Sequence, residues 1–234
     1  MANFIRMIVG LALLPACWGV SRAFADAMLA AAGAAGGLSV EAVSLLGGIA
    51  AFALAWTTLS HPVKAYVLGH ELTHALWGIL FGARPSDLKV GANGGSVRLT
   101  KSNMLITLAP YFFPFYTFVV IICALATYAF VRPLPFLPLW MFLIGFTWAF
   151  HVLFTLETLT QRQPDVKLYG RLFSWAFIFL VNVGIVLAWL AAATPLTFAE
   201  LGGFLAGRLI SAYVGVGSFF WHGGLWIYHA CTRT

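Results

Sequence analysis

The chain has 234 residues, of which 62% are hydrophobic and 9% are charged, and its formal net charge is +6. Soluble domains carry about 25% charged residues, so this composition excludes a water-soluble globule, and the many large apolar residues exclude a disordered chain. Membrane β-barrels alternate polar and apolar residues, whereas the long continuous apolar runs of this chain predict helices that span a bilayer. The cations lie at the ends of these runs, where they meet anionic head groups, so we predict a lipid bilayer as a partner and no nucleic acid.

The N-terminal part contains two apolar runs, residues 4–20 and 43–59, and a bilayer span needs about 20 residues. The segment from Arg22 to Asp26 resembles a signal-peptide cleavage site, but we interpret the first run as a retained helix. Residues 30–38 are expected to form a loop or a helix end. A third apolar run covers residues 63–82 after a turn at Pro62.

The next segment, residues 83–103, is polar and rich in glycine. Residues 88–90 and 96–99 alternate polar and apolar side chains on either side of a glycine-rich turn at residues 91–95. This pattern predicts a β-hairpin over about residues 86–101.

Four further apolar runs follow: residues 104–131, broken by Pro110 and Pro114, then 136–159, 171–193 and 201–220. In the last run small residues recur every four positions, which predicts close packing against another helix. Arg208 in the same run is expected to face protein or water. The sequence therefore predicts one domain over residues 1–234, an all-α polytopic membrane protein with about six to seven transmembrane helices and a small hairpin.

The cations also predict the orientation. Eight of them are expected on one side of the bilayer (Arg22, Arg84, Lys89, Arg98, Lys101, Arg162, Lys167 and Arg171) and three on the other (Arg6, Lys64 and Arg132). Because the more cationic side faces the cytoplasm, we predict a multi-pass protein of a bacterial cytoplasmic (inner) membrane. The hairpin and the loop that holds Asp165 then share the cytoplasmic side.

The third run contains two histidines, His70 and His74, one helical turn apart, with Glu71 between them. Residues four apart project from one face of a helix, so both imidazoles can bind one zinc ion while Glu71 acts as a general base. A charged group at the centre of a membrane helix costs at least about 2.5–3.5 kcal/mol, which favours a functional role. The alternative is a hydrogen-bonded Glu-His pair that only joins helices.

The sequence G-H-E-L-T-H-A, which begins at Gly69, resembles the zinc helix of the site-2 protease class, the M50 intramembrane metallopeptidases. As in that class, a hairpin follows, and then a helix with L-A-P-Y ending at Tyr111. The resemblance implies a zinc helix over about residues 63–82, a third-ligand region over about 160–172, His70 and His74 as zinc ligands, and Glu71 as the catalytic base.

Catalytic zinc takes a third protein ligand, and in the family this is an Asp on a later helix. Asp165 is the first choice, although Gln161 and Val166 depart from the family's motif; otherwise it is an exposed loop carboxylate. His151, deep in the fifth run, is the rival third ligand. It could instead act in catalysis by stabilising an oxyanion, or form only a structural hydrogen bond.

These residues predict a zinc-dependent endopeptidase that cleaves a transmembrane protein substrate. A substrate must be unwound locally, and the hairpin could bind it as an added strand, with Asn93, Val97 and Leu99 as substrate-binding residues. Two alternatives stay open: a zinc-free relative that only binds membrane partners, and a small transporter or channel with a buried His/Glu site. The sequence does not indicate the oligomeric state.

Overall fold

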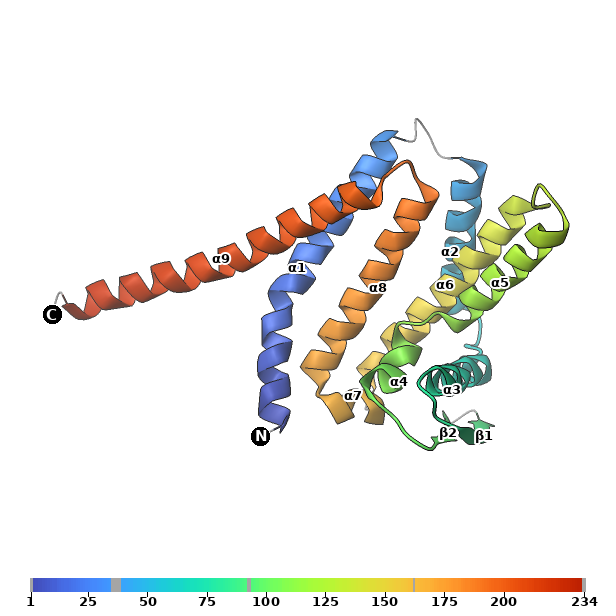
Figure 1. The fold of residues 1–234 in the computed structure, drawn as a ribbon, viewed down its shortest axis with the longest axis horizontal. Helices are drawn as coiled ribbons and strands as arrows, with labels where there is room; N and C mark the ends of the chain where they lie inside the picture. The colour runs from blue at the N-terminus through green and yellow to red at the C-terminus, as the bar shows by residue number, and fades with distance from the viewer. Residues whose placement is uncertain (1, 35–38, 92–93, 162, 233–234) are drawn as a thin grey trace. The chain divides into compact units, whose positions relative to one another are not determined.

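The computed structural model describes residues 2–34, 39–91, 94–161 and 163–232, and it divides into two compact units. One unit contains α1 (Ala2–Ala34), α8 (Arg171–Ala193) and α9 (Phe198–Thr232). The other contains α2 (Val40–Thr58), α3 (Val63–Leu80), β1 (Pro85–Gly91), β2 (Gly94–Leu99), α4 (Met104–Leu108), η1 (Ala109–Tyr111), α5 (Phe115–Phe130), α6 (Leu137–Thr160) and α7 (Pro164–Tyr169). The predicted fold class, all-α with a small hairpin, is confirmed (Figure 1). The description of residues 1–234 as a single domain stays a prediction.

Within the described residues, five helices are long and apolar enough to cross a membrane. They are Phe4–Gly33, Val40–Thr58, Leu137–Thr160, Arg171–Ala191 and Phe198–Trp226. The pair Met104–Tyr111 and Phe115–Phe130 adds a sixth if it is counted as one bent span. The chain is therefore a membrane protein. The helix α3, which the sequence predicts as one of the membrane runs, is not among these spans, because Lys64, the two histidines and Glu71 lower its hydropathy.

The helices α2 and α6 lie against each other through glycines. A Cβ atom at Gly145 would lie 2.1 Å from the carbonyl oxygen of Leu45, and one at Gly48 would lie 2.0 Å from that of Phe142. No side chain fits at either position, so the two backbones approach closely, as small residues allow in membrane helices. The aromatic ring of Phe52 then packs edge-on against Phe146 at 5.0 Å between ring centroids.

The predicted hairpin is confirmed, and it lies against α3. Strands β1 and β2 pair antiparallel from Pro85↔Leu99 to Gly91↔Gly94, with an irregularity between Ser86 and Lys89. Within this unit the hairpin, α3 and α7 are gathered at one end of the α5–α6 pair (Figure 1).

The predicted break in the fourth apolar run is also confirmed. The segment formed by α4 and η1 meets α5 at a bend of 81°. Pro110 lies in η1 and Pro114 precedes α5, and each proline lacks the N–H that a continuous helix needs. The side chain of Asn103 caps α4 by accepting a hydrogen bond from the N–H of Ile106 at 2.9 Å. The bend brings η1 alongside α3, where the candidate functional residues lie.

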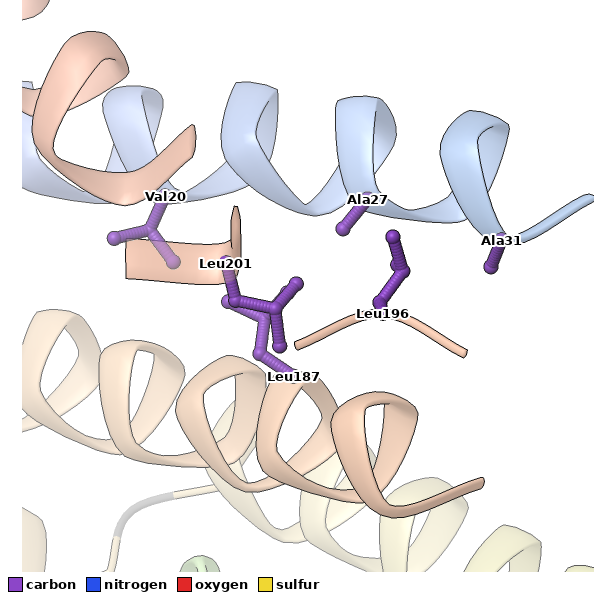
Figure 2. Close-up of a cluster of buried hydrophobic side chains, with 6 residues drawn as sticks. All are labelled: Val20, Ala27, Ala31, Leu187, Leu196 and Leu201. Atoms are coloured by element: carbon purple, nitrogen blue, oxygen red, sulfur yellow. The ribbon is translucent and has the colours of Figure 1, made fainter. Parts of the chain in front are cut away.

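The other unit is held together by an apolar cluster between α1, α8 and the start of α9 (Figure 2). Figure 2 labels its buried members: Val20, Ala27, Ala31, Leu187, Leu196 and Leu201. The small Ala27 and Ala31 come from α1 and face leucines of the other segments, so the α1 backbone can lie close to its neighbours.

Arg208 of α9 forms an ion pair with Asp26 of α1, and one of its hydrogen bonds is 2.9 Å long. The prediction that Arg208 faces protein is thereby confirmed. The predicted close packing of the small residues of α9 is wrong for the glycines in the described part of the chain. A Cβ atom added at Gly203, Gly207 or Gly215 would have nothing within 4 Å. Other residues of α9 do approach α1: Gly19 of α1 lies against the Arg208 backbone, and the Tyr213 hydroxyl donates to the carbonyl oxygen of Ala12 at 2.8 Å.

Candidate metal centre

The helix α3 presents two imidazoles to the same point, as the four-residue spacing predicts. The rings of His70 and His74 are 4.9 Å apart between centroids. With Asp165 of α7 they form a group in which one donor atom of each residue lies within 4.8 Å of the others. This is the one such group of at least three metal-ligating side chains in the described residues.

The distances from Asp165 to the two imidazoles fit a small tetrahedral metal ion. The Oδ2 atom of Asp165 lies 3.6 Å from Nε2 of His70 and 3.5 Å from Nε2 of His74. Two ligands at zinc–nitrogen and zinc–oxygen bond lengths are about 3.4 Å apart in a tetrahedron. Two imidazoles and one carboxylate are also a donor set that catalytic zinc uses. The residues present therefore fit the metal that the sequence predicts, and the group can hold a metal ion.

The tautomer of His74 is fixed by a backbone carbonyl. Its Nδ1 atom lies 2.9 Å from the carbonyl oxygen of Ile106, at the start of the bent segment. A carbonyl oxygen only accepts, so Nδ1 carries the proton and Nε2 keeps its lone pair for a metal.

His70 has a similar partner, although a hydroxyl takes the place of the carbonyl. Its Nδ1 atom lies 3.4 Å from the hydroxyl oxygen of Tyr66, one helical turn earlier on α3. The Tyr66 ring stacks on Phe154 of α6 at 4.7 Å between centroids. The hydroxyl also forms a hydrogen bond with the side chain of Thr158, and Nε2 of His70 is again the atom that faces Asp165.

Asp165 reaches the group from the first turn of α7, after Pro164. Burial raises the pKa of its carboxyl group, but hydrogen bonds with His70 and His74 and their nearby charge outweigh that effect. The net result is a pKa held well below its usual range, so the carboxylate is ionised and able to bind a cation. The alternative interpretation of Asp165 as an exposed loop carboxylate does not match this placement.

Glu71 is 7% exposed and lies close enough to interact electrostatically with His70, His74 and Asp165. Its carboxylate forms a hydrogen bond with the backbone of Val97 in β2. A Cβ atom at Gly95 would lie 2.9 Å from Cγ of Glu71, so the glycine lets the hairpin cover the acid. The hairpin is thus a wall of the site as well as a neighbouring element.

The structure places Asp165, and not His151, beside the two imidazoles. His151 is buried on α6 and lines a cavity of about 20 Å³, together with His70, Tyr66 and Pro110. This volume is about that of one water molecule. Its Nε2 atom has no hydrogen-bond partner among the described residues. A catalytic role for His151 stays a prediction.

The three residues predicted to bind substrate have different outcomes. Val97 is half-buried in β2, and its backbone forms a hydrogen bond with the Glu71 carboxylate. Leu99 packs on α3, since its Cδ2 atom would lie 2.9 Å from a Cβ at Gly78. Asn93 lies outside the described residues. Substrate binding by these residues stays a prediction.

Two tyrosines at the site, Tyr66 and Tyr111, are not predicted from the sequence. Tyr66 lies four residues before His70, so its position on the same helical face was a usable signal. Tyr111 directly follows Pro110, and no local pattern indicates that its hydroxyl reaches Asp165.

No known protein family, curated protein or solved structure matches this chain.

Proposed function

We propose that the chain is an intramembrane zinc-dependent endopeptidase that cleaves a peptide bond of a transmembrane protein. The observation that carries the proposal is the meeting of two α3 imidazoles and the α7 carboxylate, with Glu71 beside them. Three protein ligands would leave a bound zinc ion able to take a water molecule as well, which is typical of catalytic rather than structural zinc. The burial of an acid next to the three ligands supports hydrolysis.

The roles of the residues follow from their chemistry. His70, His74 and Asp165 would hold the ion with Nε2, Nε2 and Oδ2. When bound, zinc supplies a Lewis acid that polarises a carbonyl and lowers the pKa of a water molecule. Glu71 accepts the proton of the attacking water and passes it to the amine that leaves when the peptide bond breaks. The covering hairpin limits the access of bulk water to this acid.

The hairpin supports the assignment of a peptide substrate. A two-stranded sheet leaves one edge of each strand unpaired, and an unwound segment of a substrate can pair with such an edge. The backbone of Val97 bonds to Glu71, so an edge strand of the hairpin lies next to the proton acceptor. A peptide bound along β2 therefore brings its carbonyl groups close to the ligand group.

The cations support the proposed location in a bacterial cytoplasmic membrane, with the site toward the cytoplasm. The hairpin segment carries Arg84, Lys89, Arg98 and Lys101, and Lys167 lies in α7. These segments flank the ligand group, and cytoplasmic segments are enriched in Lys and Arg. One count changes in the structure: Arg22 lies inside α1 rather than at its end.

The test combines metal content with cleavage of a transmembrane reporter protein by the purified full chain in lipid vesicles. We expect about one zinc ion per wild-type chain and cleavage of the reporter. Glu71→Gln should retain zinc and lose at least about 100-fold in cleavage, since general base catalysis contributes about 10²–10⁴-fold. Glu157→Gln is the matched control, because Glu157 lies half-buried near the end of α6, beside His61 and outside the ligand group, and it should cleave like the wild type.

Two results would contradict the proposal. Wild-type protein without metal would favour the zinc-free relative or the transporter. A Glu71→Gln variant that cleaves normally would show that the acid is not the base.

A further inference from the structure

The side chain of Tyr111 is completely buried, and its hydroxyl forms a hydrogen bond with one of the three candidate metal ligands. Its side chain is the largest among the fully buried ones in the described chain. The hydroxyl donates to Oδ2 of Asp165 at 3.2 Å. A phenol removed from water needs such a partner, so this hydrogen bond determines where the carboxylate lies as much as where the ring lies.

The acceptor atom is the one that faces the imidazoles. Oδ2 of Asp165 is also the oxygen nearest to Nε2 of His70 and of His74. In addition, the ring of Tyr111 packs edge-on against the ring of His70, at 5.4 Å and 86°. One side chain therefore contacts two of the three ligand residues, which come from two different helices.

The backbone of Tyr111 is itself held in place. It lies in η1 after Pro110, where the chain bends, and η1 packs on α3. The imidazole of His151 forms a hydrogen bond with the Tyr111 backbone. The buried His151 thus supports the position of the phenol from the α6 side.

We propose that Tyr111 is a positioning residue whose hydroxyl holds the Asp165 carboxylate at the metal, so that the hydroxyl acts on metal affinity through Asp165. The proposal rests on the proposed function insofar as that function supplies the metal ion. It is tested by metal binding, which is measured without any cleavage. Partners in the outer shell of a metal site fix the ligand's orientation, and their loss costs about 10–100-fold in affinity.

The experiment uses the full chain in detergent and titrates Zn²⁺ against a competing chelator, with the Co²⁺ absorption spectrum as a second readout. Tyr111→Phe should bind Zn²⁺ about 10–100-fold more weakly and show an altered Co²⁺ spectrum, because the carboxylate is less constrained. Tyr116→Phe is the matched control. Its hydroxyl donates to the carbonyl of Ala65 at 2.6 Å and contacts no ligand atom of the site, so its Zn²⁺ affinity should equal that of the wild type.

A double-mutant cycle with Asp165→Asn makes the test specific. In that background the carboxylate charge is gone, so Tyr111→Phe does not leave a half-buried charge without its donor. Thermal unfolding of each variant checks that it folds. The added Tyr111→Phe change should then have no further effect on Zn²⁺ affinity. Three results would each overturn the proposal. Tyr111→Phe could bind Zn²⁺ as tightly as the wild type, Tyr111→Phe and Tyr116→Phe could lose affinity equally, or the losses in the cycle could be additive. If the wild type binds Zn²⁺ and cleaves nothing, only the proposed function fails.

Discussion

Both units of the molecule contain charged residues among apolar helices, but they arrange them differently. In the unit of α1, α8 and α9, Asp26 and Arg208 satisfy each other in one bidentate pair. In the other unit, His70, His74 and Asp165 point to a common position between them. In an ion pair the two charged groups bind each other, so neither is left to bind a ligand. Three converging donors instead leave a position for a cation between them. Convergence, rather than burial of charge, therefore distinguishes the group that can hold a metal ion from the ion pair.

The largest expected effect comes from removing the third donor. Asp165→Ala removes a direct ligand, so it should lower Zn²⁺ affinity by more than about 100-fold. Loss of an outer-shell partner costs at most about that much. His151→Ala is the comparison and should lose much less affinity than Asp165→Ala, because His151 lies outside the ligand group and acts only through the Tyr111 backbone. Zinc content after dialysis measures both. Loss of metal in His151→Ala with retention in Asp165→Ala would reverse the assignment of the third ligand.

A smaller effect is expected from the glycines, which also differ between the two units. Gly145→Ala forces a methyl group against the backbone of α2 and should lower the free energy of unfolding by about 1–3 kcal/mol. Gly207→Ala in α9 meets nothing within 4 Å among the described residues, so its free energy of unfolding should change by less than about 0.5 kcal/mol. Thermal unfolding in detergent compares the two variants. An equal loss for both would show that Gly207 contacts a partner helix.

The smallest effect is expected at the ion pair. Asp26 and Arg208 are partly exposed, so Asp26→Asn should lower the unfolding temperature by less than Gly145→Ala does and leave Zn²⁺ affinity unchanged. The same unfolding and zinc titrations measure this. A weaker Zn²⁺ affinity in Asp26→Asn would contradict the distinction between a structural pair and a converging ligand group.

The sequence predicts much of this fold because local signals decide it. Apolar length specifies the spans, the glycine-rich turn specifies the hairpin, and Pro110 with Pro114 specifies the break. The spacing of His70 and His74 likewise predicts two donors on one helical face, which the structure confirms.

What the sequence predicts less well depends on contacts between distant segments. Asp165 is assigned to the group through the family resemblance, because no local pattern shows that α7 lies against α3, where the three donors meet. The small residues of α9 show the opposite error, since a packing motif is present but the described residues supply no partner. The apolar residues of 63–82 predict a transmembrane span, but α3 is not apolar enough for one, because its polar side chains form the candidate metal group.

The break at η1 has a consequence for how the donors respond to movement. The carbonyl of Ile106 orients His74 and the hydroxyl of Tyr111 reaches Asp165, and both residues belong to the short α4–η1 segment before the bend. Straightening or sliding of this short segment would therefore disturb two donors from separate helices in a single event. The affinity for the metal ion therefore reports on the geometry of the bent span, and it can be measured without any peptide cleavage.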